Sequence, residues 1–522
     1  MKDKLRLLIL VIPIALLSMV SAGYASVNDT NTTEDIGLPP YQYISPTPGE
    51  FPIIGWGLYF DTARSVFKDF VDCGFNAALI IPRKSNVDAL MTALNTINNN
   101  DTLKLNLILH MRELMDNYEP EQSYSLMNTF LYWFRKYLNK NKHIKITGWF
   151  LEDEPIYYQF FNWSRYFHNM AQHDTTRMSW ANLMGDPRAT GFLYLTDPIT
   201  STNDHTIIQL PKTASYREYI ENFSYMLRPG VLSYDYYPIG LDSKGKDVTI
   251  TKNRLDDFYT SLQMYSEISK KRGCPFWAFC QSRATGLDSN YNRIGSGHPA
   301  PTETFLRYEA FNALAFGAQG IEYWNYKEEF PFPKDSVRKE YYALATYEGE
   351  KTPLWNYARN VNREIKAFTR VFLGAKLKSY YFVGDKRDTN YDDYKIAKNT
   401  DPIIVKSFRP ALDTVGSNHG ALVSTLTNGI DKYVVIVNQS PYDNASLLVT
   451  LNNRDYKISE LKYQAGSSSE YLEVSSSKPT IQSLKISLEP SQYKIYRFST
   501  RISFGNMNKT ETFQDTLPLS TI

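Results

Sequence analysis

The sequence predicts a (β/α)8 barrel followed by a C-terminal antiparallel β-sandwich. Two observations carry this prediction. Eight short apolar, β-leaning runs alternate with segments of helical spacing between about residues 51 and 374, which is the pattern of a parallel barrel. After about Gly374 the pattern changes to short β-branched runs separated by turn residues, which is typical of a sandwich. A chain of 522 residues is long enough to fold as two such domains.

The predicted barrel covers residues 51–374, and its strands and helices follow one another in chain order. The strands are expected at residues 52–59, 75–81, 104–111, 144–151, 177–183, 231–237, 275–280 and 320–326. The helices are expected at 61–73, 86–97, 121–138, 256–272, 303–316 and 354–372, the first of them behind an aspartate cap at Asp61. A long insertion separates the fifth strand from the sixth.

The predicted sandwich covers residues 375–500, and a polar tail covers 501–522. Strand-like segments within it are expected at 421–426, 432–438, 445–451, 456–461 and 485–498. These segments carry no internal repeat of short period, so a solenoid is not indicated.

The N-terminus has the features of an export signal. Lys2, Lys4 and Arg6 precede an apolar run from Leu7 to Val20, and small residues follow up to Ala25. The run is short for a bilayer span and contains a proline, so cleavage is expected rather than retention as an anchor. We therefore expect a signal peptide at 1–25, a flexible leader at 26–50, no membrane span after cleavage, and a secreted or periplasmic location.

The charge of the chain excludes simple electrostatic capture of nucleic acid. The formal net charge is +2, and the signal segment alone contributes +2 from Lys2, Lys4, Arg6 and Asp3. The mature chain is therefore near neutrality, with no basic excess for nucleic acid or an anionic membrane.

The cysteines do not form a disulfide framework. Only three are present, Cys73, Cys274 and Cys280, all in or beside apolar segments. A Cys274–Cys280 bridge would have to span one predicted strand end to end, which its length disfavours. Buried free thiols are expected.

The fourth predicted strand ends in three carboxylates and a proline, in the stretch from Gly148 to Pro155. Three adjacent acids at the end of a buried strand are costly, because like charges repel and a desolvated carboxylate resists ionisation. From these residues alone two interpretations stay open. The acids belong to a carboxylate enzyme, or they are solvated side chains where a strand ends.

In a barrel of this class the chemistry gathers at the carboxyl ends of the strands. The side chains expected there are carboxylates, amides and aromatic rings, namely Trp56, Tyr59, His110, Glu152, Asp153, Glu154, Trp180, Asn182, Asp235, Tyr237, Gln281, Glu322, Trp324 and Asn325. Such a set predicts a pocket for a neutral polyhydroxylated ligand. The 7 histidines show no metal-binding spacing, so a metal-dependent hydrolase is disfavoured and neither metal nor cofactor is expected.

Four stretches resemble one superfamily. Trp149–Pro155 resembles the Asn-Glu-Pro signature on strand four of the retaining glycoside hydrolase clan built on (β/α)8 barrels, with Asp153 where asparagine is usual. Ser233–Pro238 is similar to the Asp-His-Tyr-Pro stretch on strand six of family 42 β-galactosidase-like enzymes. Pro275–Ser282 and Arg307–Tyr326 look like segments of related exported bacterial glycosidase-like proteins.

The resemblance implies an exported enzyme that cleaves O-glycosidic bonds of an oligosaccharide or polysaccharide. It implies that Glu154 is the general acid and later the general base, with a raised pKa to which Asp153 and Glu152 would contribute. It also implies that Trp324 forms the floor of the sugar site. Asp153, Asn182, Tyr237, Gln281, Glu322 and Trp324 are the expected substrate-binding residues.

The second catalytic carboxylate is where the chain departs from the clan. The clan's nucleophile is a glutamate at the end of strand seven, and Gln281 stands at about that place. An amide cannot serve as a nucleophile or base, so the second acid must come from elsewhere, with Asp235 the first candidate and Glu322 the next. Each has an alternative: Asp235 as a partner of a tyrosine hydroxyl, and Glu322 as a buried structural acid. If no second carboxylate lies within about 10 Å of Glu154, the alternative function is a non-catalytic carbohydrate-binding protein on a degenerate barrel.

Overall fold

The computed structural model describes one compact unit within Pro39–Ile522. The described residues are 43–59, 64–81, 105–111, 131–132, 134, 136, 145–187, 215–241, 248–250, 252–284, 298–328, 343–384, 401–410, 420–466, 471–475 and 479–501. The predicted signal peptide, most of the leader, the helix at 86–97, most of the helix at 121–138 and nearly all of the tail lie outside these residues.

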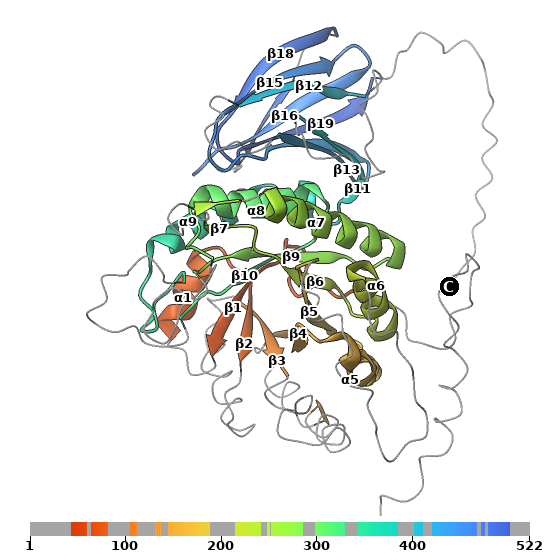
Figure 1. Cartoon of the computed structure of the whole chain (residues 1–522), viewed down its shortest axis with the longest axis vertical. Coiled ribbons are helices and arrows are strands. Elements are labelled where there is room, and N and C mark those ends of the chain that lie inside the picture. Colours follow the sequence, from red (N-terminus) through yellow and green to blue (C-terminus); the bar gives the residue numbers. More distant parts are fainter. Residues whose placement is uncertain are drawn as a thin grey trace, which may run out of the picture. The chain divides into compact units, whose positions relative to one another are not determined.

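Eight parallel strands close into a barrel in the order β1-β10-β9-β6-β5-β4-β3-β2 (Figure 1). They are β1 (Ile53–Tyr59), β2 (Ala77–Ile81), β3 (Asn106–His110), β4 (Ile146–Asp153), β5 (Met178–Met184), β6 (Leu232–Asp235), β9 (Phe276–Gln281) and β10 (Ile321–Trp324). Each strand falls within or beside a predicted segment. The predicted barrel is therefore confirmed.

The described helices are α1 (Arg64–Asp72), the 3-10 turn η1 (Tyr157–Gln159), α5 (Phe160–His173), α6 (Tyr216–Leu227), α7 (Lys252–Arg272), α8 (Glu303–Ala315), α9 (Pro353–Ala367) and α10 (Thr369–Phe372). The strands β7 (Gly240–Leu241) and β8 (Val248–Thr249) form a small antiparallel pair after β6. Helices α5 and α6 are findings of the structure, since no element was predicted at either place.

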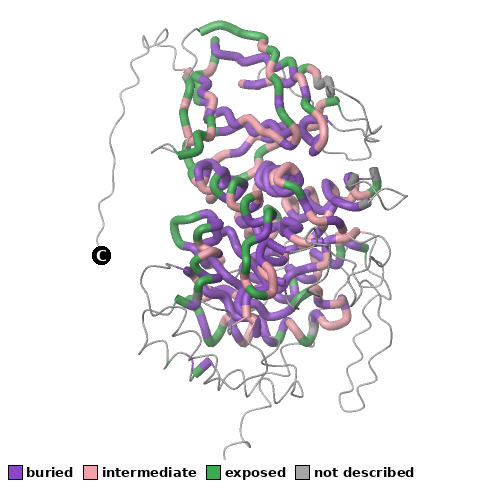
Figure 2. Tube along the Cα trace, turned by 90° about the vertical axis from the view of Figure 1, so that its left-hand side faces the viewer, coloured by how far each residue is buried: buried purple, intermediate pink, exposed green. Residues whose placement is uncertain are grey.

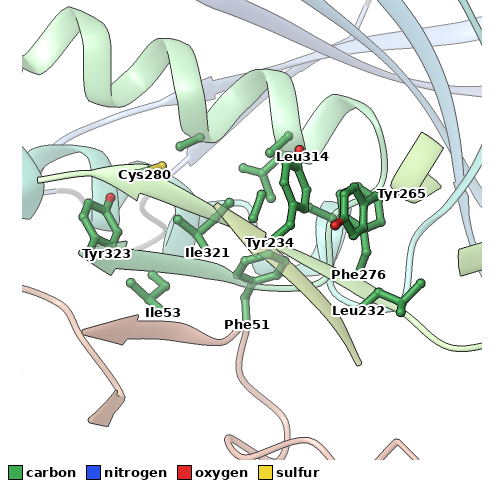
Figure 3. Packing of buried hydrophobic residues seen from close by; sticks show 14 of the residues in the cluster. Phe51, Ile53, Leu232, Tyr234, Tyr265, Phe276, Cys280, Leu314, Ile321 and Tyr323 are labelled. Carbon is green, nitrogen blue, oxygen red and sulfur yellow. The ribbon is translucent and has the colours of Figure 1, made fainter. Parts of the chain in front are cut away.

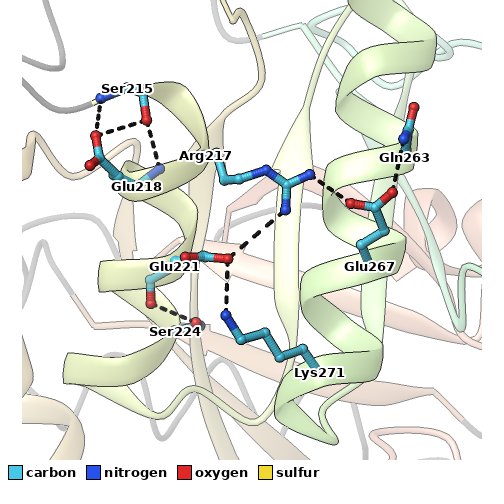
Figure 4. Close-up of polar contacts among 8 residues, drawn as sticks. All are labelled: Ser215, Arg217, Glu218, Glu221, Ser224, Gln263, Glu267 and Lys271. Carbon is cyan, nitrogen blue, oxygen red and sulfur yellow. Dashed lines mark hydrogen bonds and ion pairs between the residues drawn. The ribbon is translucent and has the colours of Figure 1, made fainter. Parts of the chain in front are cut away.

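Helix α6 begins with a capping box. The Ser215 hydroxyl accepts from the Glu218 backbone N–H at 3.2 Å, and the Glu218 carboxylate accepts from the Ser215 N–H at 2.7 Å (Figure 4). Ion pairs then join α6 to α7, with Arg217 on Glu267 and Lys271 on Glu221 (Figure 4). These contacts fix the two helices that follow β5 and β6, the strands that carry part of the site.

Alternate residues of the strands build two separate apolar layers. Side chains such as Ile53, Tyr234 and Ile321 point outward and pack with helix residues such as Leu314 and Tyr265 (Figure 3). The inward-facing set fills the barrel and is Ile54, Trp56, Ala77, Leu79, Ile108, Phe150, Met178, Trp180, Val231, Trp277 and Phe279. Burial along the barrel strands is nearly continuous, as expected for a parallel sheet covered on both faces (Figure 2).

Two glycines make room for the large rings inside the barrel. A Cβ added at Gly148 would lie 2.7 Å from the Trp180 ring, and one added at Gly320 would lie 2.6 Å from the Trp277 ring. Both tryptophans are 0% exposed. They belong to the packed interior, so Trp180, which was expected at the strand ends, is a core residue.

The C-terminal part is a sandwich of two antiparallel sheets. One sheet has the order β11-β13-β14-β19-β16-β17 and the other β12-β15-β18. The strands are β11 (Lys376–Val383), β12 (Ile403–Pro410), β13 (Ala421–Asn428), β14 (Asp431–Asn438), β15 (Ala445–Asn452), β16 (Tyr456–Tyr463), β17 (Tyr471–Ser475), β18 (Ile481–Leu488) and β19 (Tyr493–Thr500). Apolar residues of both sheets form one core, so the predicted sandwich is confirmed. The single segment predicted at 485–498 is in fact two strands, β18 and β19.

A polar and aromatic contact links barrel helices to the sandwich. The Arg307 guanidinium of α8 pairs with Glu364 of α9 at 2.7 Å, and the Tyr493 hydroxyl of β19 donates to the same carboxylate at 3.0 Å. The ring of Tyr493 stacks on Phe311 with centroids 3.6 Å apart. A charge-assisted network of this kind holds β19 against α8 and α9.

The three cysteines are free and buried, as predicted. Among the described residues, no helix has the length and apolar character needed to cross a membrane.

Candidate active site

A β-bulge in β4 decides which acids face the interior of the barrel. Along the β4–β5 pairing, Phe150 lies opposite Trp180. Three residues further along β4, Asp153 lies opposite Asn182, which is only two residues further along β5. The extra residue reverses the alternation of side chains. Asp153 therefore faces inward, whereas Glu152 is buried on the other side and accepts a hydrogen bond from the Asp153 backbone N–H at 2.8 Å.

Glu154 follows the bulge in a left-handed conformation, with φ of 48°. A non-glycine residue held there costs about 1–3 kcal/mol, and such strain persists where surrounding contacts impose it. Here the Glu154 backbone N–H donates to the Asn182 carbonyl at 2.8 Å, which continues the pairing of β4 with β5 past the strand end. This contact fixes the position from which the Glu154 side chain enters the cavity.

The carboxyl groups of Glu154 and Asp235 lie within hydrogen-bonding reach of each other. Burial raises the pKa of Glu154 well above its usual range, and the charges of Asp235 and Asp153 raise it further. Burial and the charge of Asp153 also raise the pKa of Asp235, but hydrogen bonds from Asn182 and Glu154 oppose that rise. Glu154 therefore holds its proton more tightly than Asp235, and Asp235 is the first of the two to ionise as pH rises.

The Asn182 amide bridges two of the acids. Its Nδ2 donates to Asp235 Oδ1 at 2.8 Å and to Asp153 Oδ1 at 3.1 Å. Since only the NH2 group can donate to carboxylates, these two bonds fix the orientation of the amide. The Asn182 Oδ1 then faces the Ser233 hydroxyl at 3.1 Å.

Glu322 lies behind this amide and is 0% exposed. Its Oε2 is in hydrogen-bond contact with Ser233 Oγ, and its Oε1 accepts from Trp56 Nε1 at 3.2 Å. Burial raises the pKa of Glu322 to about 8. The side chain points inward, as strand parity predicted, but it does not line the cavity. It is the buried acid of the alternative interpretation, and Ser233 and Asn182 link it to Asp235 and Asp153.

A cavity of about 450 Å³ opens at the carboxyl ends of the strands. Its lining residues are Trp56, Asp153, Glu154, Asn182, Met184, Asp186, Asp235, Tyr236, Tyr237, Arg254, Phe279, His298 and Trp324. Acids and an amide lie beside flat aromatic rings, a combination that suits a ligand with hydroxyl groups and apolar ring faces.

The ring of Trp324 forms part of one aromatic wall. It lies nearly parallel to the Tyr237 ring, with centroids 6.1 Å apart and an interplanar angle of 23°. The Arg283 guanidinium lies 5.2 Å from the Trp324 centroid and pairs with Glu328 at 3.2 Å. Trp324 and Tyr237 thus both line the cavity, and Arg283 packs on the Trp324 ring.

A neutral histidine stands on the same wall. The Ile239 carbonyl lies 2.6 Å from His298 Nδ1 and 3.1 Å from an Arg254 Nη1. A carbonyl only accepts, so Nδ1 carries the proton and Nε2 does not. Burial, with the neighbouring Arg254 charge, lowers the pKa of His298 to about 4. The ring is therefore uncharged at neutral pH.

Gln281 does not line the cavity. It is 0% exposed, and its Nε2 donates to the carbonyls of Arg283 at 2.8 Å and Pro299 at 2.6 Å. Its backbone N–H donates to the Glu309 carboxylate at 3.0 Å. Where the resemblance places a nucleophile, this chain has an amide that ties the end of β9 to the following segment.

The structure gathers six of the predicted site residues at the cavity: Asp153, Glu154, Asn182, Asp235, Tyr237 and Trp324. Gln281 and Glu322 are not in the lining. Sequence reasoning missed Met184, Asp186, Arg254, Phe279 and His298 as lining residues, and Ser233 as the link to Glu322. Ser233 lies two residues before Asp235 on the same predicted strand, so the sequence indicated that both side chains point to the same face. No sequence pattern indicated that Arg254 or His298 would line the cavity. His110, considered as a pocket donor, packs against Phe150 with ring centroids 4.9 Å apart.

No family model and no curated protein sequence matches the chain. Among solved structures, a GH27 β-L-arabinopyranosidase from Geobacillus stearothermophilus has a TM-score of 0.44 and 8% identity, covering 88% of this chain and 98% of that one. A GH30 endoxylanase from Clostridium papyrosolvens has a TM-score of 0.37 and 11% identity, covering 87% of this chain and 97% of that one. A glucosidase from Croceicoccus marinus has a TM-score of 0.39 and 10% identity, covering 89% of this chain and 98% of that one. Likenesses this distant carry no argument about activity.

Proposed function

We propose that this protein hydrolyses O-glycosidic bonds of an oligosaccharide or polysaccharide, with Glu154 and Asp235 as its catalytic carboxyls. The observation that carries the proposal is the neighbouring Glu154–Asp235 pair in the cavity at the carboxyl ends of the strands. Two neighbouring carboxyls, of which Glu154 holds its proton more tightly than Asp235, supply an acid and a base in one place. Glycoside hydrolysis needs two carboxyl groups, one that donates a proton and one that is ionised.

Glu154 is suited to act as the general acid. Half-buried beside two other acids, it keeps its proton at neutral pH and can deliver it to the glycosidic oxygen as the bond to the sugar breaks. Once the proton has left, the Glu154 carboxylate can take a proton from the water that completes hydrolysis. The aromatic rings of Trp324 and Tyr237 would stack on the apolar face of the sugar.

Asp235 is suited to act as the nucleophile of a retaining reaction. Carboxyls that retain the anomeric configuration lie about 5–5.5 Å apart, and those that invert it lie about 6.5–9.5 Å apart. Two carboxyls within hydrogen-bonding reach of each other have a separation nearer to the retaining range than to the inverting range. A sugar ring that enters between them therefore has to move them apart only slightly. Asp235 Oδ would then bond to the anomeric carbon while the leaving oxygen takes the Glu154 proton, and water would release the sugar.

The rival function, carbohydrate binding without cleavage, depended on the lack of a second carboxylate near Glu154. The closeness of Asp235 to Glu154 argues against it. Export is part of the proposal and is supported by the basic N-terminus and apolar run that precede Ala25.

A panel of glycosides tests the proposed function. The mature chain is incubated with aryl glycosides of both anomeric configurations and with neutral oligosaccharides, and the products are followed by NMR from the first minutes. We expect at least one substrate to be cleaved and its first-formed sugar to keep the anomeric configuration of the substrate. Tight binding of sugars without any cleavage would favour the rival function, and a first-formed product of inverted configuration would remove Asp235 as nucleophile.

A further inference from the structure

The hydrogen bonds that link Asp235 to Asn182, Ser233 and Glu322 determine whether Glu322 carries a proton. Asn182 uses both Nδ2 hydrogens on Asp235 and Asp153, so its Oδ1 can only accept. The polar group facing that oxygen is the Ser233 hydroxyl at 3.1 Å. Ser233 has one hydroxyl hydrogen. Because Ser233 is 0% exposed and Asn182 is 2% exposed, Asn182 Oδ1 must accept this hydrogen to have a hydrogen-bond donor.

The same hydroxyl is also in contact with Glu322 Oε2. With its hydrogen donated to Asn182, the Ser233 oxygen can only accept from Glu322, and a carboxylate has nothing to donate. Glu322 must therefore be a carboxylic acid, with the proton on Oε2. Its other oxygen, Oε1, then acts as the carbonyl acceptor for Trp56 Nε1. Only in this arrangement does every hydrogen have an acceptor while Asn182 Oδ1 also has a donor.

We propose that Glu322 is a positioning residue that works as a neutral acid, donating through Ser233 to hold the Asn182 amide against Asp235 and Asp153. The inference rests on the proposed catalytic role of Asp235, because its consequence is the orientation and protonation of that carboxylate. Glu322 touches no ligand itself. It keeps Asn182 from turning, and the Asn182 hydrogen bond in turn helps keep Asp235 ionised.

The charges around Glu322 agree with a neutral side chain. In the part of the chain that the structure describes, the charged groups acting on Glu322 are Asp235 at the end of β6 and Asp153 at the end of β4. Its direct polar contacts are Trp56 of β1 and Ser233 of β6. Both charged neighbours are acids, so ionised Glu322 would be a buried charge facing like charges, and burial itself raises its pKa to about 8.

Glutamine is the matched replacement, because its Nε2 can donate to Ser233 while its Oε1 accepts from Trp56. The test compares wild type with Glu322→Gln, Glu322→Ala and Ser233→Ala. The first readout is the infrared carboxylic acid C=O stretch near pH 6, with no substrate present. We expect the wild-type minus Glu322→Gln difference spectrum to show one protonated carboxyl. An ionised carboxylate band in its place would overturn the proposal whether or not the protein cleaves glycosides.

The second readout is the pH profile of kcat/KM. Loss of the Asn182 hydrogen bond raises the pKa of Asp235, so the acid limb should move to higher pH in Ser233→Ala and Glu322→Ala and stay in place in Glu322→Gln. We expect kcat to fall at least tenfold in the two alanine variants, with KM changing much less. A loss in Glu322→Gln equal to that in Glu322→Ala, or an unmoved acid limb in the folded Ser233→Ala variant, would overturn the positioning role.

The third readout is stability against pH, which needs no activity. A carboxyl with a raised folded pKa binds a proton that the unfolded chain has released, so stability falls as pH rises from about 4.5 to about 8. Glu322→Gln lacks this loss. Its denaturation midpoint should match that of wild type near pH 4 and exceed it at pH 8, and a wild-type advantage at pH 8 would contradict a neutral Glu322.

Discussion

Asp235→Asn should lower kcat/KM by at least about 10⁴-fold, the order of loss found when an enzyme is deprived of its nucleophile. Asparagine keeps the shape of the side chain and can still accept from Asn182 through its oxygen. An amide, however, cannot form the bond to the anomeric carbon. Steady-state kinetics on the best substrate of the panel measures the loss.

The control for this variant is Asp186→Asn, which changes another carboxylate of the same cavity lining. We expect it to lose far less activity. Asp235→Asn should remain folded, because it removes a half-buried acid that is repelled by Asp153. Equal losses in the two folded variants would mean that Asp235 contributes only to the general charge of the cavity.

Glu154→Gln should lower kcat/KM by about 10²–10⁴-fold on substrates with a poor leaving group, which is the usual contribution of a general acid. Aryl glycosides with an acidic leaving group need little protonation, so the loss on them should be much smaller. Kinetics on a matched pair of glycosides that differ only in the leaving group measures the difference. A loss that is the same for both would assign Glu154 to binding rather than to proton transfer.

The pH profile of wild type adds a second check on Glu154. The acid must be protonated, so activity falls as pH rises through the raised pKa of Glu154, and it falls at low pH as Asp235 gains a proton. Because the two carboxyls interact, the two limits belong to the pair. The alkaline limit should disappear in Glu154→Gln and persist in Glu322→Gln.

The barrel could be predicted because its strands are buried on both faces and so form continuous apolar runs. Helix α6 was also within reach, since Ser215 and Glu218 have the spacing of a capping box. Helix α5 was not, because its N-cap position is Gln159 with no capping side chain. Strands β18 and β19 were merged since only the short turn around Glu489–Gln492 separates them.

The site could be predicted only in part, for a physical reason. Glu154, Asp235 and Trp324 follow from the rule that strand ends carry the chemistry. The bulge before Asp153 does not, because one extra residue in a strand is visible only in its pairing with β5. For the same reason Glu152 was expected to raise the pKa of Glu154, whereas the bulge turns it away. The resemblance places the second carboxylate on β9, where this chain has Gln281, whereas the carboxylate that we propose for this role, Asp235, lies on β6.

The central claim is that Asp235 bonds to the sugar while Glu154 supplies the proton. The most direct measurement uses an activated 2-deoxy-2-fluoro glycoside of the cleaved sugar, whose leaving group departs readily while the fluorine slows release of the covalent intermediate. Peptide mapping by mass spectrometry should find the fluorosugar on Asp235, and Asp235→Asn should take up no label. A label on Asp153 or Glu322, or inactivation without any covalent sugar, would contradict the account.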